Sequence, residues 1–94
     1  MASTAELQVD VVAADHSVWS GQAARVVART AEGEIGILPR HEPLLGVLAE
    51  GEVRILLTSG EQITAQAEGG FLSVENNRVT IVADRAELSA PVNS

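Results

Sequence analysis

Apolar and polar residues alternate with a period of two over much of this chain. In the first such segment Leu7, Val9 and Val11 fall on one face, whereas the polar residues between them fall on the other. Successive side chains of a β-strand point to opposite faces, so this alternation predicts a strand with one side turned toward a core. The pattern recurs in residues 25–30, 53–58, 62–68 and 78–83. In two of these segments we expect Ile55 and Ile81 to face inward.

Turn-forming residues separate these segments at intervals of about 8–12 residues, a spacing typical of a β-sandwich or barrel. Asn76-Asn77 predicts a tight hairpin, because asparagine tolerates a positive φ. In Leu44–Glu50 the β-branched residues and Gly46 favour a strand over a helix. We therefore predict an all-β fold, with about ten short strands in a two-sheet β-sandwich. The predicted turns are Ser20-Gly21, Gly33, Pro39 to Pro43, Glu50-Gly51, Ser59-Gly60, Gly69-Gly70 and Asn76-Asn77.

The length of 94 residues corresponds to one domain, since domains usually have ~100–200 residues. We expect residues 1–87 to form the sandwich and residues 88–94 to form a flexible tail. Residues 84–88 also fit the start of a helix, which Pro91 would end at once. Val79–Val82 and Leu56-Leu57 carry apolar residues on both faces. These strands are expected to be covered by the second sheet on one side and by a partner on the other.

The residue types present limit the classes of function. Apolar residues make up 46%, which is typical of a globular protein, and the core must be aliphatic because Trp19 and Phe71 are the only aromatic residues. The chain has no cysteine, which excludes disulfides, zinc–thiolate sites and iron–sulfur clusters. It also has no lysine, which excludes a Walker-type phosphate loop and a Schiff-base enzyme.

The charge and the hydropathy exclude other partners. Thirteen acidic residues outnumber six arginines and give a formal net charge of −7, which opposes binding to nucleic acid or to anionic lipid. Apolar runs are all shorter than the ~18–20 residues of a membrane span, and the N-terminus has no signal-peptide pattern. We predict a protein made in the cytoplasm, without direct membrane insertion.

Candidate catalytic and metal-binding groups are few. His16 and His41 are 25 positions apart in turn-like segments, so neither predicts a metal site. Asp15-His16-Ser17 has the letters of a catalytic triad, but adjacent residues of an extended chain point in opposite directions. Carboxylate pairs at Glu32/Glu34 and Glu50/Glu52 leave open a small hydrolase or lyase, although solvated surface charge is their usual state. We expect no catalytic residue, cofactor or metal.

The segment from Gly33 to Leu45 combines two glycines and two prolines with charged side chains. It predicts a rigid hairpin followed by a proline-framed corner. A rigid loop binds a partner without a large ordering cost, so this segment is also a candidate contact loop.

The segment GEIGILP, followed by HEPL, resembles the hallmark sequence of the epsilon subunit of bacterial F-type ATP synthases. Two further stretches agree with this resemblance. Trp19-Ser20-Gly21 is similar to the family's aromatic-Ser-Gly turn, and residues 69–74 and 77–84 are similar to its Gly-Gly hairpin and last strands. The resemblance runs from about residue 6 to residue 84, in order and with family-like spacings.

The resemblance implies a ten-stranded sandwich in the central stalk, or rotor, of the ATP synthase. It implies two partners, the gamma subunit and the ring of c subunits, at the cytoplasmic face of the bacterial plasma membrane. Glu34 and the Arg40–Glu42 corner would meet the polar loops of the ring, whereas His41 and Leu45-Gly46 would lie near gamma. Arg40 departs from the glycine that is common at its position. The expected partner-binding residues are Glu34, Ile35, Arg40, His41, Glu42, Leu45 and Gly46.

Family members usually continue into two C-terminal helices that regulate the enzyme and in some cases bind ATP. The present sequence ends at Ser94, so those activities are not carried over. The expected function is to link gamma to the c-ring without catalysis. The alternative is a stand-alone β-sandwich that binds a ligand, although two aromatic residues are few for a sugar site.

Overall fold

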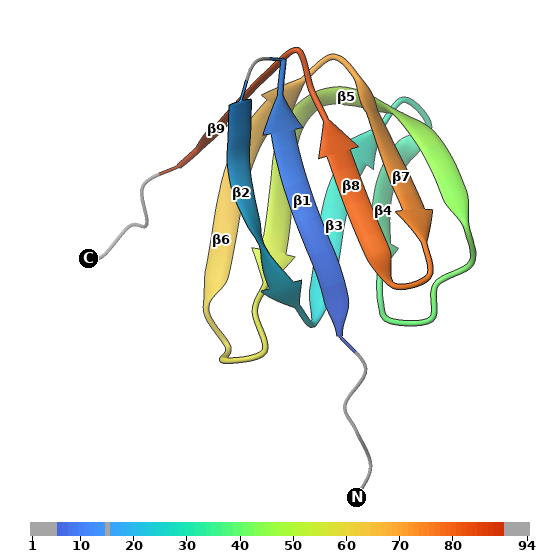
Figure 1. Cartoon of the computed structure of the whole chain (residues 1–94). Helices are drawn as coiled ribbons and strands as arrows, with labels where there is room; N and C mark the ends of the chain where they lie inside the picture. Colours follow the sequence, from blue (N-terminus) through green and yellow to red (C-terminus); the bar gives the residue numbers. More distant parts are fainter. Residues whose placement is uncertain (1–5, 15, 90–94) are drawn as a thin grey trace, which may run out of the picture.

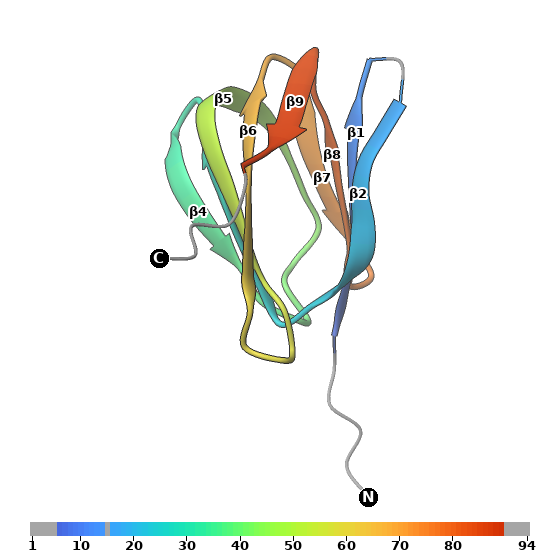
Figure 2. The same ribbon diagram turned by 90° about the vertical axis from the view of Figure 1, so that its left-hand side faces the viewer.

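The computed structural model describes residues 6–14 and 16–89. The regular secondary structure in this part of the chain consists of β-strands alone. The strands are arranged in two facing layers (Figures 1 and 2), which confirms the predicted all-β sandwich. The described residues form nine strands, one fewer than expected. They are β1 (Leu7–Ala13), β2 (His16–Ala23), β3 (Arg25–Thr30), β4 (Gly33–Ile37), β5 (Leu44–Leu56), β6 (Gln62–Glu68), β7 (Phe71–Glu75), β8 (Arg78–Val82) and β9 (Arg85–Leu88).

Strand β5 joins the two layers into one curled sheet. Its first residues, Leu44–Val47, pair with β7 in the first sheet, whose strand order is β2-β1-β8-β7-β5. Its last residues pair with β3 on one side and β6 on the other, in the second sheet. The second sheet is completed by β4 beside β3 and by β9 beside β6. The turn predicted at Glu50-Gly51 is therefore wrong, because both residues lie within the 13-residue strand β5.

The core lies between the two sheets and consists of the residues that the alternation placed inward. Ile55 and Ile81 are both fully buried, as predicted. Their neighbours in the core come from both sheets, so the two inner faces form a single hydrophobic cluster. Burial of a Val, Leu or Ile side chain stabilises a fold by about 1.5–3 kcal/mol. The largest fully buried side chains are those of Leu7, Ile37, Ile55, Leu72, Ile81, Val9, Val11, Val26, Val53, Val74 and Val79.

The hairpin predicted at Asn76-Asn77 is confirmed. It joins β7 to β8, and the two asparagines have φ of 51° and 62°. A two-residue hairpin turn with both central residues at positive φ matches the right-handed twist of the flanking strands.

The turn predicted at Ser20-Gly21 and the hairpin that the resemblance implied at Gly69-Gly70 are both corrected. Ser20-Gly21 is not a turn but lies inside β2, where a Cβ on Gly21 would come within 2.8 Å of the Trp19 ring. A larger residue at this position would therefore require the Trp19 ring to move. Gly69-Gly70 is not a hairpin either, because it carries the chain from β6 in the second sheet to β7 in the first. Gly70 has a φ of 101°, and a Cβ there would overlap the carbonyl of Val82.

The C-terminal part of the described chain is a strand where the sequence also fitted a helix start. Strand β9 (Arg85–Leu88) pairs antiparallel with Ala65–Glu68, because its backbone can complete the open edge of β6. Ser89 continues the pairing by donating its N–H to the carbonyl of Thr64 at 2.8 Å. Regular pairing thus continues two residues beyond the expected domain end at residue 87. Residues 90–94 of the expected tail, Pro91 among them, lie outside the described residues.

Candidate partner interface

A row of apolar side chains crosses the outer face of the first sheet. Leu45 and Val47 on β5 are 74% and 63% exposed, and Phe71 on β7 is 45% exposed. Strand register makes the row continuous, because Val47 lies opposite Phe71, Phe71 opposite Val82, and Val82 opposite Val12. We call these five residues the apolar row. A contiguous exposed apolar surface of this kind usually marks an interaction site.

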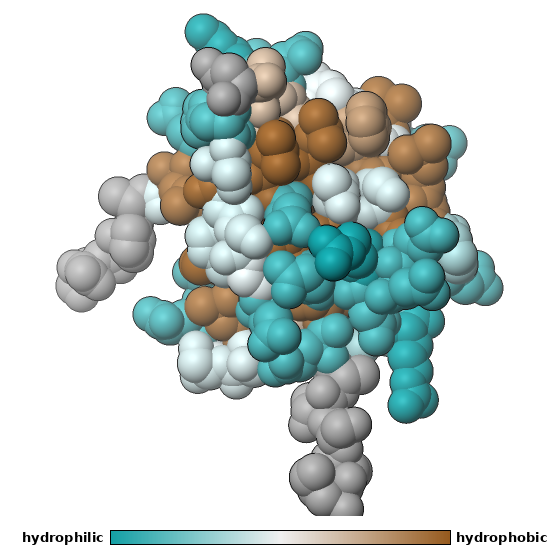
Figure 3. Space-filling view, viewed as in Figure 1, coloured by the Kyte–Doolittle hydropathy of each residue, from teal (hydrophilic) through white to brown (hydrophobic). Residues whose placement is uncertain are grey.

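The rest of the same face is polar. Ser20 donates to Asp10 at 2.7 Å, and Arg78 pairs with the same carboxylate at 3.3 Å. Figure 3 shows brown residues gathered over the upper part of this face and teal residues over the lower part. The boundary between the two parts runs across the strands, so a partner that covers the apolar row would meet polar groups along one side.

A groove of about 210 Å³ adjoins the apolar row beside strand β4. Ile35, Leu44 and Leu45 supply its apolar walls, and Gly46 leaves it open because it has no side chain. The β3–β4 turn closes one end, where the N–H of Ala31 donates to the carbonyl of Val47 at 2.9 Å. Three of the predicted contact residues, Ile35, Leu45 and Gly46, are therefore brought together here.

Glu34 lies elsewhere, on the outer face of the second sheet. Its Oε2 accepts from Arg54 Nη2 at 2.9 Å, and the two side chains are 51% and 40% exposed, respectively. Arg29 is its register partner on β3. The carboxylate is thus presented as half of an ion pair, next to a shallow hollow that Arg25 and Val27 also line.

Arg40, His41 and Glu42 form a third location, at the corner between β4 and β5. The N–H of His41 donates to the carbonyl of Leu38 at 3.1 Å, and His41 Nδ1 donates to the carbonyl of Glu42 at 2.8 Å. Arg40 has a φ of 71°, a conformation that glycine adopts more easily. This explains in physical terms why a glycine suits the position at which the sequence has arginine.

The structure therefore divides the seven predicted contact residues into three places. Glu34 and the corner lie at opposite ends of β4, whose five residues span about 13 Å at 3.3 Å per residue. Sequence reasoning did not identify Val47, Phe71 or Val12 as exposed neighbours. A signal for part of the row was present, since Val79–Val82 carries apolar residues on both faces and was expected to meet a partner.

The groups considered for catalysis do not form a site. Glu32 and Glu50 are exposed, Glu34 is paired with Arg54, and the carboxylate of Glu52 accepts from the side-chain amide of Gln66 at 3.4 Å. Asp15 of the triad-like sequence lies outside the described residues. Among residues 6–14 and 16–89, His, Asp and Glu side chains nowhere gather in a group of three that could hold a metal ion.

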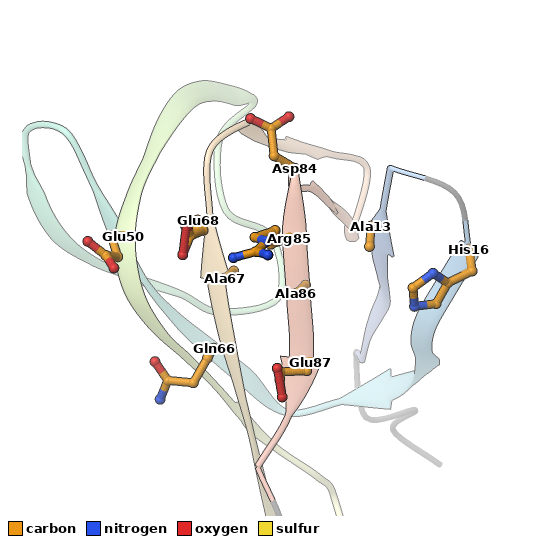
Figure 4. Close-up of a pocket in the computed structure, with 10 residues that line it drawn as sticks. All are labelled: Ala13, His16, Glu50, Gln66, Ala67, Glu68, Asp84, Arg85, Ala86 and Glu87. Carbon is orange, nitrogen blue, oxygen red and sulfur yellow. The ribbon is translucent and has the colours of Figure 1, made fainter.

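A hollow of about 440 Å³ lies along the open seam between β9 and the β1–β2 hairpin. Carboxylates of Glu50, Glu68, Asp84 and Glu87 surround it, and Figure 4 shows the Arg85 side chain extending toward Glu68, its register partner. These charged groups are well solvated, so the seam is an acidic surface and not an enclosed binding pocket.

Comparison with known proteins identifies relatives over nearly the whole chain. The family model of the ATP synthase delta/epsilon chain beta-sandwich domain matches residues 6–89. The ATP synthase epsilon chain of Streptomyces avermitilis is 49% identical over 90 residues, which are 96% of this chain and 73% of that one. The ATP synthase epsilon chain of Micrococcus luteus is 55% identical over 84 residues, which are 89% of this chain and 92% of that one.

Solved structures agree with the fold. A chain in the Euglena gracilis mitochondrial ATP synthase (OSCP/F1/c-ring, rotational state 1) superposes with a TM-score of 0.85 and 26% identity. The match covers 94% of this chain but only 56% of the Euglena chain. A chain in the central stalk/c-ring structure of the Tetrahymena thermophila enzyme has a TM-score of 0.70 at 20% identity, which supports the fold alone.

Proposed function

Because the chain belongs to the beta-sandwich family of ATP synthase delta and epsilon chains, we propose that it is a central-stalk subunit that links the gamma subunit to the c-ring. It carries no catalysis of its own and transmits rotation by binding both partners. The apolar row is the observation that carries this proposal, since a subunit of a larger assembly must expose a surface that a second protein can bury.

We assign gamma to the apolar row, the adjoining groove and the corner. The row supplies the apolar centre that a stable interface needs, and the groove supplies a recess for a partner side chain. His41 and Arg40 add polar groups from the corner that leads into β5. This arrangement of an apolar centre with polar groups at its margin is typical of protein interfaces.

We assign the c-ring to the end of the domain that carries Glu34. The expected ring contacts included the Arg40–Glu42 corner as well, but Glu34 lies on the outer face of the second sheet whereas the corner leads into the part of β5 that carries Leu45, so we place the two in different contacts. At the Glu34 end, the ion pair with Arg54 offers both a donor and an acceptor to polar loops. A polar, exposed contact suits an attachment that adds orientation more than affinity.

The described residues contain no helix that could span a bilayer. We propose that the protein is held at the cytoplasmic face of the bacterial plasma membrane by its two partners, as a peripheral subunit. Its net charge of −7 opposes direct attachment to anionic lipid, so the contact with the membrane-embedded ring would supply the localisation.

A matched pair of leucine substitutions tests the assignment of gamma. Leu45 in the apolar row and Leu88 on β9 are both exposed, at 74% and 42%. Leu45→Glu places a charge in the proposed interface and should weaken binding to an epsilon-free head complex containing gamma by at least about 100-fold, because an unpaired charge would be buried. Leu88→Glu makes the same chemical change outside it and should leave the affinity within about threefold of the parent.

Binding can be measured by titrating the labelled domain against that head complex. Circular dichroism and thermal unfolding of both variants establish that each is folded. Equal affinities of the two variants would contradict the assignment of gamma to the apolar row. If neither the parent nor the variants bind the head complex, the stand-alone ligand-binding alternative is favoured.

A further inference from the structure

The corner between β4 and β5 begins with a type II turn over Leu38–His41. The turn is closed by the hydrogen bond from His41 N–H to the Leu38 carbonyl, at 3.1 Å. Pro39 occupies its second position, where the ring requires a negative φ, and Arg40 occupies its third position with a φ of 71°. Among the common four-residue turns, only type II combines a negative φ at the second position with a positive φ at the third.

Arginine is an unfavourable residue for this third position. Type II turns prefer glycine or asparagine there, because a Cβ crowds the backbone at positive φ. A type I turn has negative φ at both central positions and accepts most residues. The two types differ mainly in the orientation of the central peptide, which here joins Pro39 to Arg40. The local sequence therefore favours type I, and something outside the turn must select type II.

The side chain of Asn77 makes the contact that can do so. Its Oδ1 accepts a hydrogen bond from the N–H of Arg40 at 2.7 Å, across 37 positions of sequence. This N–H belongs to the central peptide, so rotating the peptide into the type I orientation would turn the N–H away from Asn77. The contact is thus available to one turn type and not to the other.

Asn77 is itself held in place. It lies in the β7–β8 hairpin with a φ of 62°, and its carbonyl accepts the N–H of Gln8 at 2.8 Å. Figure 1 shows the hairpin and the β4–β5 connection side by side at the lower edge of the domain. The acceptor is therefore fixed by two strands of the first sheet, and it can impose a conformation on the corner.

We propose that Asn77 is a positioning residue that holds the corner in its type II turn and thereby sets the direction of the Arg40 side chain toward gamma. The part that concerns gamma rests on the proposed function. Exchange to a type I turn would replace the φ of 71° at Arg40 by a negative φ, and the Cα–Cβ bond of Arg40 would then point in another direction.

Three substitutions at the hairpin isolate the side-chain amide. Asn77→Gly removes the acceptor but still permits a positive φ. Asn76→Gly is the matched control, because Asn76 also has a positive φ, of 51°, and is the neighbouring residue of the same turn. Asn77→Asp restores an acceptor oxygen in a residue that tolerates the left-handed conformation, and it should rescue the parent behaviour.

Amide hydrogen exchange in the free domain tests the turn. In Asn77→Gly the Arg40 amide should exchange about tenfold faster, the loss expected for one hydrogen bond, while the amides of β7 and β8 keep their protection. Asn76→Gly and Asn77→Asp should leave the Arg40 amide within about threefold of the parent. Unchanged exchange of Arg40 in Asn77→Gly would overturn the positioning role.

Binding to the epsilon-free head complex, combined with Arg40→Gly, tests the consequence. Glycine at the third position favours type II by itself, so the loss caused by Asn77→Gly should be about tenfold with Arg40 present and less than about twofold in the Arg40→Gly background. An equal loss in both backgrounds would mean that Asn77 acts otherwise than through the turn. If the Arg40 amide loses protection but the affinity stays at the parent value, the assignment of the corner to gamma is wrong and the positioning of the turn stands.

Discussion

The outer faces of the two sheets expose different chemistry although their inner faces share one core. The first sheet carries the apolar row, of which Leu45, Val47 and Phe71 are the most exposed members. On the second sheet, Glu34 lies opposite Arg29 in register and is paired with Arg54. Water solvates the charged groups of the second sheet well, whereas covering the apolar row with a second protein removes apolar surface from water and is therefore favourable. The comparison indicates that the outer face of the first sheet is the one suited to a packed interface.

The difference between the faces also predicts how strongly each should bind. An interface with an apolar centre loses most of its affinity when a charge is placed in that centre. An exposed ion pair contributes little to binding, because water and salt compete for both groups. The first sheet should therefore supply most of the affinity for the rotor, and the Glu34 end should supply orientation.

The largest expected effect comes from the inner faces, where the two sheets should behave alike. Ile55→Ala in the second sheet and Ile81→Ala in the first should each lower the free energy of unfolding by about 2–5 kcal/mol, because both side chains are fully buried and each truncation leaves a cavity. Urea denaturation measures both. A loss below 1 kcal/mol for one of the two isoleucines would show that its sheet is not part of the common core.

Much of this core was predictable because it depends on local alternation. Side chains at successive positions of a strand point to opposite faces, so Val9 and Ile81 could be placed inward from their neighbours alone. The Asn76-Asn77 hairpin was predictable for a similar reason, since the turn chemistry lies within the two residues.

The features that sequence reasoning missed depend on contacts between distant residues. The alternation of buried and exposed residues in β5 changes phase between Leu48 and Val53, where the strand passes from one sheet to the other, and Glu50-Gly51 at this point has the composition of a turn. The apolar row exists because register places Val47 opposite Phe71, a pairing that neither segment specifies by itself. The bond from Arg40 to Asn77 likewise joins residues 37 positions apart. The sequence alone therefore predicts which residues face the core, but it does not predict which exposed residues of different strands lie next to one another.

An intermediate effect is expected from reversing a charge at the Glu34 end. Glu34→Arg removes the carboxylate that Arg54 contacts and places a third guanidinium next to those of Arg29 and Arg54. It should therefore weaken rotor assembly by about tenfold. Glu61→Arg, an equal change at the exposed β5–β6 turn, is the control. ATP-driven proton pumping by the reconstituted enzyme should fall for Glu34→Arg and not for the control. Pumping that is unchanged in both variants would remove Glu34 from the proposed ring contact.

The smallest expected effect concerns the ion pair without its partner protein. Glu34→Gln in the free domain keeps the size of the side chain and removes the charge that Arg54 contacts at 2.9 Å. Because both side chains are well exposed, the loss of unfolding free energy should be only about 0.2–1 kcal/mol. The Debye length falls from about 10 Å at 0.1 M salt to about 3 Å at 1 M, which is comparable with the 2.9 Å contact, so the difference between parent and variant should be smaller at 1 M salt. Thermal unfolding of parent, Glu34→Gln, Arg54→Gln and the double variant at the two salt concentrations measures the coupling. A coupling above about 2 kcal/mol that persists at 1 M would mean that the pair is shielded from water, and the contrast between the two outer faces would then be weaker than their exposed residues indicate.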